Sequence, residues 1–114
     1  MHELSIALSI IDGALHELRL HDGARAEAIY LRLGRLSGVN QDALLFSYEV
    51  ARRDTPLESS RLIIEDVPVS ILCSTCGGER PIAQFPVLTC AQCGAAGQVM
   101  HGEELEIIGL EIAT

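Results

Sequence analysis

Apolar residues recur at helical spacing at the start of the chain. Over residues 4–20, an apolar side chain returns every three or four positions, and polar side chains fall between. Because an α-helix has 3.6 residues per turn, this spacing places the apolar side chains on one face. The pattern predicts an amphipathic helix over residues 4–20, with a buried face made of Leu4, Ala7, Leu8, Ile11, Leu15 and Leu18.

Residues 26–36 change to a period of two, which is typical of a strand with one buried face. Ile29, Leu31 and Leu33 fall on one side and Tyr30 on the other. A turn at "SGVN" follows, and its last residue has the side chain of a good helix N-cap. The pattern predicts a second helix after this cap, with a buried side made of Leu44, Leu45, Tyr48 and Ala51.

Pro56 cannot continue this helix, so the segment 54–60 is predicted to end it. The run "RLIIEDV" predicts a strand that Pro68, which has no N–H to donate to a sheet, either ends or confines to a sheet edge. The tail 104–113 predicts a last strand. Its alternation slips near Gly109, as a β-bulge would cause.

All the cysteines lie between the second and third predicted strands. They form two Cys-x2-Cys pairs, a spacing typical of tetrathiolate zinc sites. Gly77 and Gly94 follow the pairs and can take the positive φ that turns backbone N–H groups towards sulfur. Two disulfides, a redox dithiol or an iron site are the alternatives, and the pattern favours structural zinc in a ribbon. The four residues are Cys73, Cys76, Cys90 and Cys93.

The order of elements predicts an α+β fold in which two helices pack on a small three-stranded sheet, with an inserted four-cysteine zinc ribbon. We expect one domain from residues 1–70 and 99–114, and a zinc-ribbon domain from 71–98 inserted before the last strand. A chain of 114 residues allows little more than this.

The formal net charge of −8, with eight basic residues that are all Arg, weighs against a nucleic acid as the partner. No cation precedes the apolar run from Leu4 to Ile11, as a signal peptide would require. That run is far shorter than the roughly 20 residues that cross a bilayer. We therefore expect a cytoplasmic protein that keeps Met1 and its free amine, with no nucleic-acid or membrane partner. No catalytic motif is present, so we expect no enzyme.

Five stretches, taken together and in order, resemble the HypA/HybF family of nickel metallochaperones. They are "MHELSIALSI", "LGRLSGVNQDALLFSYEVA", "TPLESSRLIIEDVP", the four cysteines and "GEELEIIGLEI". The resemblance implies a protein that binds Ni²⁺ at its amino terminus and delivers it during maturation of [NiFe]-hydrogenase, and in some bacteria urease. It also implies two partners, a HypB-type GTPase and the hydrogenase large subunit or another nickel apoenzyme.

Carried onto this chain, the resemblance makes His2 the nickel ligand, with Glu3 beside it, and makes the four cysteines the ligands of structural Zn²⁺. The chemistry agrees, because Ni²⁺ favours tetragonal nitrogen ligation. The Met1 amine, the amides of His2 and Glu3 and the His2 imidazole could supply four nitrogens, provided the helix begins after these residues. Without the resemblance, a frayed terminus is the better interpretation.

Three other histidines, His16, His21 and His101, are interpreted as solvated surface residues, although His101 could reach a metal from the exit of the ribbon. Two other classes of protein remain open. One is a ribbon-based interaction module, and the other is a thiol oxidoreductase, which would need exposed cysteines of low pKa.

Overall fold

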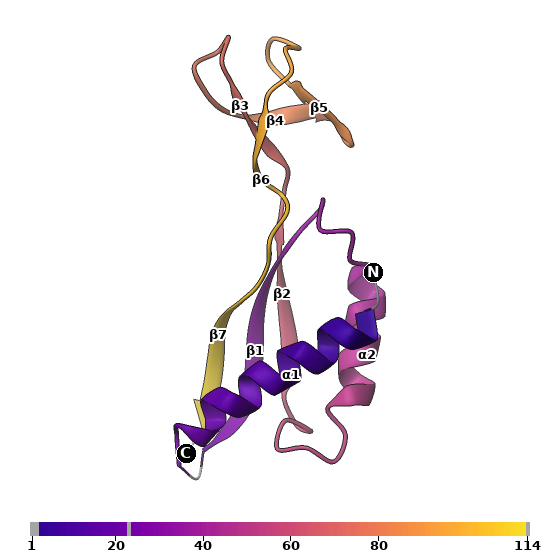
Figure 1. Ribbon diagram of the computed structural model, residues 1–114, viewed down its shortest axis with the longest axis vertical. Helices are drawn as coiled ribbons and strands as arrows, with labels where there is room; N and C mark the ends of the chain where they lie inside the picture. Colours follow the sequence, from indigo (N-terminus) through magenta and orange to yellow (C-terminus); the bar gives the residue numbers. More distant parts are fainter. Residues whose placement is uncertain (1–2, 23, 114) are drawn as a thin grey trace. The chain divides into compact units, whose positions relative to one another are not determined.

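The computed structural model describes residues 3–22 and 24–113. Two helices and seven strands follow one another along these residues (Figure 1). They are α1 (Glu3–Arg19), β1 (Arg25–Gly34), α2 (Gln41–Ala51), β2 (Arg61–Val67), β3 (Ser70–Cys73), β4 (Gly78–Gln84), β5 (Val87–Cys90), β6 (Gln98–His101) and β7 (Leu105–Ala113).

The strands form two sheets. One has three strands in the order β2-β1-β7, and the other has four strands in the order β5-β4-β3-β6. The four-stranded sheet carries the cysteines and is inserted between β2 and β7 along the chain. The predicted α+β class, with two helices, a three-stranded sheet and an inserted cysteine ribbon, is confirmed.

The chain divides into two compact units. The helix–sheet unit contains the chain up to Arg32, Gly38–Glu65 and the chain from Glu106 onward. The cysteine unit contains Leu33–Ser37 and Asp66–Leu105.

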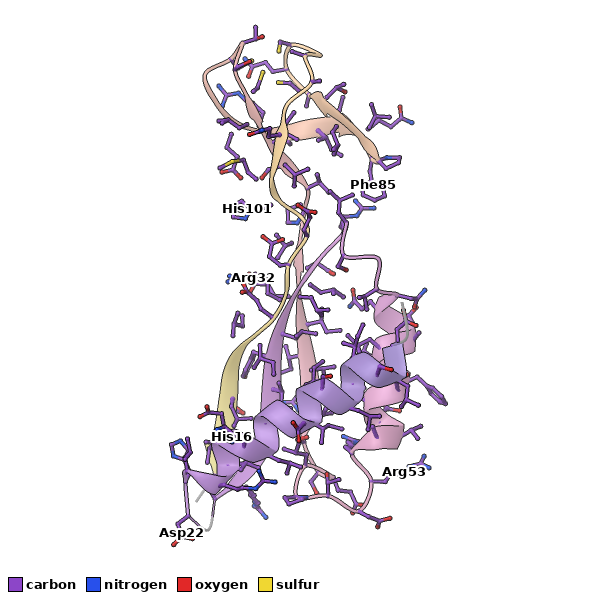
Figure 2. All side chains as sticks on the ribbon, viewed as in Figure 1. His16, Asp22, Arg32, Arg53, Phe85 and His101 are labelled. Carbon is purple, nitrogen blue, oxygen red and sulfur yellow. The ribbon has the colours of Figure 1, made fainter. Side chains whose placement is uncertain are left out.

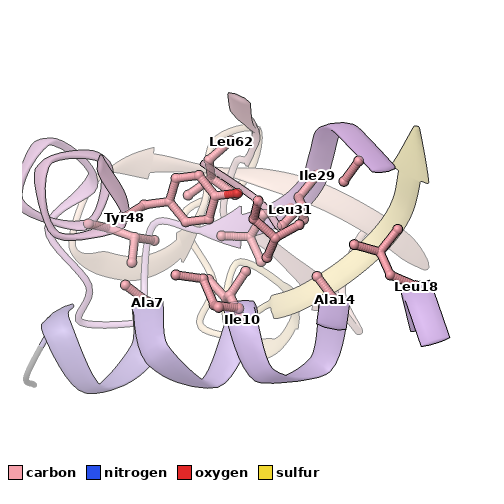
Figure 3. Close-up of a cluster of buried hydrophobic side chains, with 12 residues drawn as sticks. Ala7, Ile10, Ala14, Leu18, Ile29, Leu31, Tyr48 and Leu62 are labelled. Atoms are coloured by element: carbon pink, nitrogen blue, oxygen red, sulfur yellow. The ribbon is translucent and has the colours of Figure 1, made fainter. Parts of the chain in front are cut away.

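The core of the helix–sheet unit lies where α1 and α2 meet the sheet (Figure 3). Leu44 and Tyr48 bring α2 into this core, as predicted, and Leu45 and Ala51 are partly buried against it. The buried members of this core are Ala7, Ile10, Ile11, Ala14, Leu18, Ala26, Ile29, Leu31, Leu44, Tyr48, Leu57 and Leu62.

The predicted buried face of α1 is partly wrong. Leu4 and Leu8 are 50% and 52% exposed, whereas Ile10 and Ala14 are buried. The first half of α1 has apolar residues on more than one face, so its spacing alone allows several stripes. Packing against the sheet selects the stripe that contains Ala7 and Ala14.

Contacts across the open face of the three-stranded sheet locate the slip predicted in β7. Glu106 accepts a bond from Arg32 at 3.4 Å, and Glu111 accepts one from the Tyr30 hydroxyl at 3.4 Å. Residues 106 and 111 are an odd number of positions apart, yet both side chains reach the same face of β1. Strict alternation would put them on opposite faces. The slip therefore lies between them, in the segment that contains Gly109.

Asn40 caps α2 as predicted. Its side-chain Oδ1 accepts a hydrogen bond from the Ala43 N–H at 2.9 Å, which satisfies one of the free donors of the first turn. The Asn40 backbone N–H donates to the Glu3 carboxylate at 3.1 Å. This second bond, which the sequence did not predict, connects the first residue of α1 to the cap of α2.

The cysteine unit is larger than a ribbon over residues 71–98. β3 pairs with β4 from Ser70↔Pro81 to Cys73↔Gly78, and β6 continues the sheet to His101 on the other side of β3. The end of β1 and the residues after it also belong to this unit, and two of their backbone N–H groups bond within it. Gly34 donates to the Glu104 carbonyl at 2.7 Å, and Leu36 donates to the Gly102 carbonyl at 2.6 Å.

Candidate metal centre

Two tight turns of the same shape present the four cysteines. In the first turn the Gly77 N–H donates to the Cys73 carbonyl at 2.8 Å, and in the second the Gly94 N–H donates to the Cys90 carbonyl at 2.9 Å. Gly77 and Gly94 have φ values of 80° and 79°, a conformation that side chains disfavour. The predicted positive φ at both glycines is confirmed.

The four sulfur atoms converge on one point. All four Sγ atoms lie within 4.8 Å of one another, with 3.4 Å between Cys73 and Cys93 and 3.8 Å between Cys76 and Cys90. Four sulfurs at about 2.3 Å from a tetrahedral Zn²⁺ would lie about 3.8 Å apart. The donor set and its spacing therefore fit a tetrathiolate metal ion.

Backbone N–H groups point at two of these sulfurs. The Cys76 N–H lies 3.4 Å from Cys73 Sγ, and the Gln92 N–H lies 3.4 Å from Cys90 Sγ. The N–H of Cys76 lowers the pKa of Cys73, and N–H groups led by that of Cys93 lower the pKa of Cys90 to about 6. Both effects favour thiolates, which are the form that binds metal.

The remaining sulfurs need a cation to ionise together. The Cys93 side chain is the main cause that raises the pKa of Cys76 to about 12, because neighbouring thiols compete for negative charge. A bound divalent ion would remove this repulsion. All four residues are free thiols rather than disulfides, and Cys73 and Cys90 are buried. The disulfide alternative does not fit this centre, nor does a single redox pair.

The predicted nickel ligand, His2, lies outside the described residues. The expectation that α1 begins after the first three residues is wrong, because α1 begins at Glu3. The Glu3 side chain is held at the cap of α2 through Asn40.

His101, labelled in Figure 2, ends β6 in a small network of carboxylates. Its Nδ1 lies 2.9 Å from Glu104 and its Nε2 lies 3.9 Å from Glu79. The hydrogen bond from His101 is the main cause that lowers the pKa of Glu104, and the Gly102 N–H adds to it. The His101 side chain is 52% exposed, as expected for a surface residue. His16 and His21 are exposed, as expected.

The two helices on a three-stranded sheet, together with the four-thiol centre, define a small metal-binding protein of the α+β class. The chain belongs to the family described as hydrogenase/urease nickel incorporation metallochaperone HypA, whose family model matches residues 1–112. The resemblance noted in the sequence is thereby confirmed. Members of this family are metallochaperones, not enzymes.

Similar proteins cover nearly the whole chain. The hydrogenase maturation factor HypA of Chloroflexus aggregans is 44% identical over 112 residues, which are 97% of this chain and 98% of the relative. That of Geobacter metallireducens is 42% identical over 113 residues, 98% of this chain and 99% of the relative.

Solved structures share the fold at lower identity. The solution structure of the Ni metallochaperone HypA from Helicobacter pylori has a TM-score of 0.68 at 20% identity. The match covers 98% of this chain and 97% of that one. No helix within the described residues is long and apolar enough to cross a membrane.

Proposed function

We propose that this chain binds Ni²⁺ through its amino-terminal segment and delivers it during maturation of [NiFe]-hydrogenase. The observation that carries the proposal is the start of α1 at Glu3, whose carboxylate is anchored by the Asn40 N–H. Residues 1 and 2 directly precede this anchored turn. The ligands would therefore begin from a fixed point rather than from a free tail.

The chemistry of the segment suits nickel. In a chain that begins at Met1, the amine, the His2 imidazole and the amides of His2 and Glu3 provide four nitrogens within three residues. Ni²⁺ binds such a tetragonal nitrogen set well.

The four cysteines hold a structural Zn²⁺ in this proposal. Zinc fits the convergence of four sulfurs and the all-thiolate donor set, and such a closed site leaves no open position for catalysis. The zinc would fold the cysteine unit rather than be passed on. The domain division proposed from the sequence, with nickel in the helix–sheet part and zinc in the ribbon, rests on the same assignment.

The proposed partners are those that the family resemblance implies. Delivery would involve a HypB-type GTPase and the hydrogenase large subunit, in the cytoplasm. Urease is a second candidate recipient, because the family description names both enzymes. Nickel is the cargo in each case.

Calorimetric titration with Ni²⁺ tests the nickel site on zinc-loaded, tag-free protein. One variant adds a single Gly before Met1, which keeps every side chain but moves the amine away from His2. A second variant, His2→Ala, removes the imidazole. We expect about one Ni²⁺ per chain for the original protein and at least a tenfold loss of affinity in both variants.

His16→Ala serves as the matched control, because His16 is an exposed histidine within α1. It should bind nickel as the original protein does. Affinity should also fall below about pH 6.5, where the imidazole of an ordinary histidine becomes protonated. Equal binding by the original protein and the His2→Ala variant would place the ligands elsewhere.

A further inference from the structure

The open face of the three-stranded sheet has an uneven distribution of charge. On the central strand β1, Arg32 (Figure 2) is flanked by Glu65 of β2 at 3.6 Å and by Glu106 of β7 at 3.4 Å. Two carboxylates therefore share one guanidinium. This excess of negative charge is what a chain of net charge −8 leads one to expect.

Basic residues outnumber acidic residues on this face where β1 and β2 begin. Arg25 is the first residue of β1 and Arg61 is the first residue of β2, and these two strands are neighbours in the sheet. The next residues, Ala26 and Leu62, point into the core, so both arginines belong to the open face. Glu27 is the acidic residue that accompanies these two arginines.

A pocket of about 300 Å³ lies at this place. The residues that line it are two arginines, a glutamate, a serine and an alanine: Arg25, Arg61, Glu27, Ser59 and Ala26. Arg25 and Arg61 are exposed, and in the described part of the chain neither makes an ion pair or a side-chain hydrogen bond.

We propose that this pocket is a binding site for an oxyanion with two negative charges, such as a phosphoryl group or a pair of carboxylates. Each guanidinium offers a planar fork of N–H donors that matches phosphate or carboxylate oxygens. The Ser59 hydroxyl adds a third donor. The site belongs to the helix–sheet unit and uses none of the residues assigned to nickel or zinc.

Glu27 determines which anions can bind. Its carboxylate offsets one of the two positive charges, so a singly charged ion such as chloride gains little attraction. A doubly charged oxyanion still gains from both guanidiniums, and it can bridge them with separate oxygens. The pocket therefore favours doubly charged over singly charged anions. Removing the Glu27 charge should strengthen the binding of either.

The experiment follows the Arg25 and Arg61 Nε–H signals by NMR at constant ionic strength. Inorganic phosphate, malonate and chloride are added separately to zinc-loaded protein at about pH 7.5, where the dianion is the major form of phosphate. We expect saturable shifts with phosphate or malonate at millimolar concentrations and none with chloride. A response to phosphate alone assigns a phosphoryl ligand, and a response to malonate alone assigns a dicarboxylate.

Three variants and one control make the test specific. Arg25→Gln and Arg61→Gln should each weaken binding about tenfold, and Glu27→Gln should strengthen it about tenfold. Arg53→Gln should leave it unchanged, because Arg53 is exposed outside the pocket. All four positions are exposed, so the fold should tolerate each change. Equal shifts with chloride, or an Arg53→Gln loss as large as that of Arg25→Gln, would overturn the proposal.

Discussion

At the scale of single residues, His101 and Glu104 form the contact with the clearest pH dependence. Glu104 accepts from His101 at 2.9 Å and from the Gly102 N–H at 2.7 Å. Both bonds stabilise the ionised carboxylate, and the bond from His101 is the larger cause of the lowered pKa. The folded state therefore holds this carboxyl ionised to a lower pH than the unfolded chain does.

The direction of the linkage follows from this lowered pKa. The contribution of Glu104 to stability is fully present above the ordinary glutamate pKa of about 4.3, and it is lost as the pH falls through the folded value. We predict that His101→Ala raises the pKa of Glu104 towards the ordinary value. Carbon-13 NMR titration of the Glu104 carboxyl measures this shift.

His16→Ala is the control for this titration, because it removes an exposed histidine from a different element. It should leave the Glu104 curve unchanged. If Glu104 titrates at the same pH with and without His101, the Gly102 N–H alone would account for the lowered pKa.

At the scale of elements, the end of β1 lies against the segment that leads into β7. A Cβ added at Gly34 would overlap the Gly102 carbonyl and approach the Glu103 nitrogen to 2.7 Å. The Gly34 N–H also donates to Glu104 in this segment. A residue with a side chain cannot occupy position 34 unless two backbone segments separate.

We predict that Gly34→Ala lowers the free energy of unfolding by at least about 2 kcal/mol, because the new methyl group meets backbone atoms rather than a movable side chain. Gly13→Ala makes the same chemical change within α1, where the nearest atom is Ile107 Cδ1 at 3.6 Å. That variant should gain up to about 1 kcal/mol from helix propensity. Urea unfolding of both variants checks the opposite signs, and equal effects would contradict the contact at Gly34.

The elements that local signals define were predictable from the sequence. Asn40 and Pro68 set the start of α2 and the end of β2, because a cap and a missing N–H act within a few residues. The cysteine turns were predictable for the same reason. The buried stripe of α1 was not, since Ile10 and Leu8 are equally apolar and only the sheet distinguishes them.

Contacts between segments that are far apart along the chain could not be predicted from the sequence pattern. The bond from Asn40 to Glu3 joins residues 37 positions apart, and nothing in either local pattern indicates it. The same holds for Leu33–Ser37, which belongs to the cysteine unit although its first two residues are the end of β1. The proposed anion pocket also depends on β1 lying beside β2, which pairs Arg25 with Arg61.

At the scale of the whole molecule, each unit has its own source of stability. The core of the helix–sheet unit draws on α1, β1, α2 and β2 and includes no residue of the cysteine unit. The core of the cysteine unit is small. The hydrophobic cluster around the cysteines has three buried residues, Ile71, Cys73 and Cys90, and two of these three are proposed metal ligands. Leu33 and Val69 are also buried in this unit, outside the cluster. Because so few side chains are buried in this unit, we expect a bound metal ion to supply most of its folding free energy.

Cys73→Ala should therefore unfold the cysteine unit and leave the helix–sheet unit folded. The change removes one thiolate of four, and zinc bound to such sites contributes roughly 10–16 kcal/mol of apparent binding free energy. Both tyrosines of the chain, Tyr30 and Tyr48, belong to the helix–sheet unit, so their near-ultraviolet circular dichroism reports on that unit alone. We expect this signal to persist while amide NMR signals of β3–β6 collapse.

Ser74→Ala, within the same turn, should keep zinc and both sets of signals. Loss of the tyrosine signal in Cys73→Ala would mean that the helix–sheet unit depends on the zinc centre for its own fold.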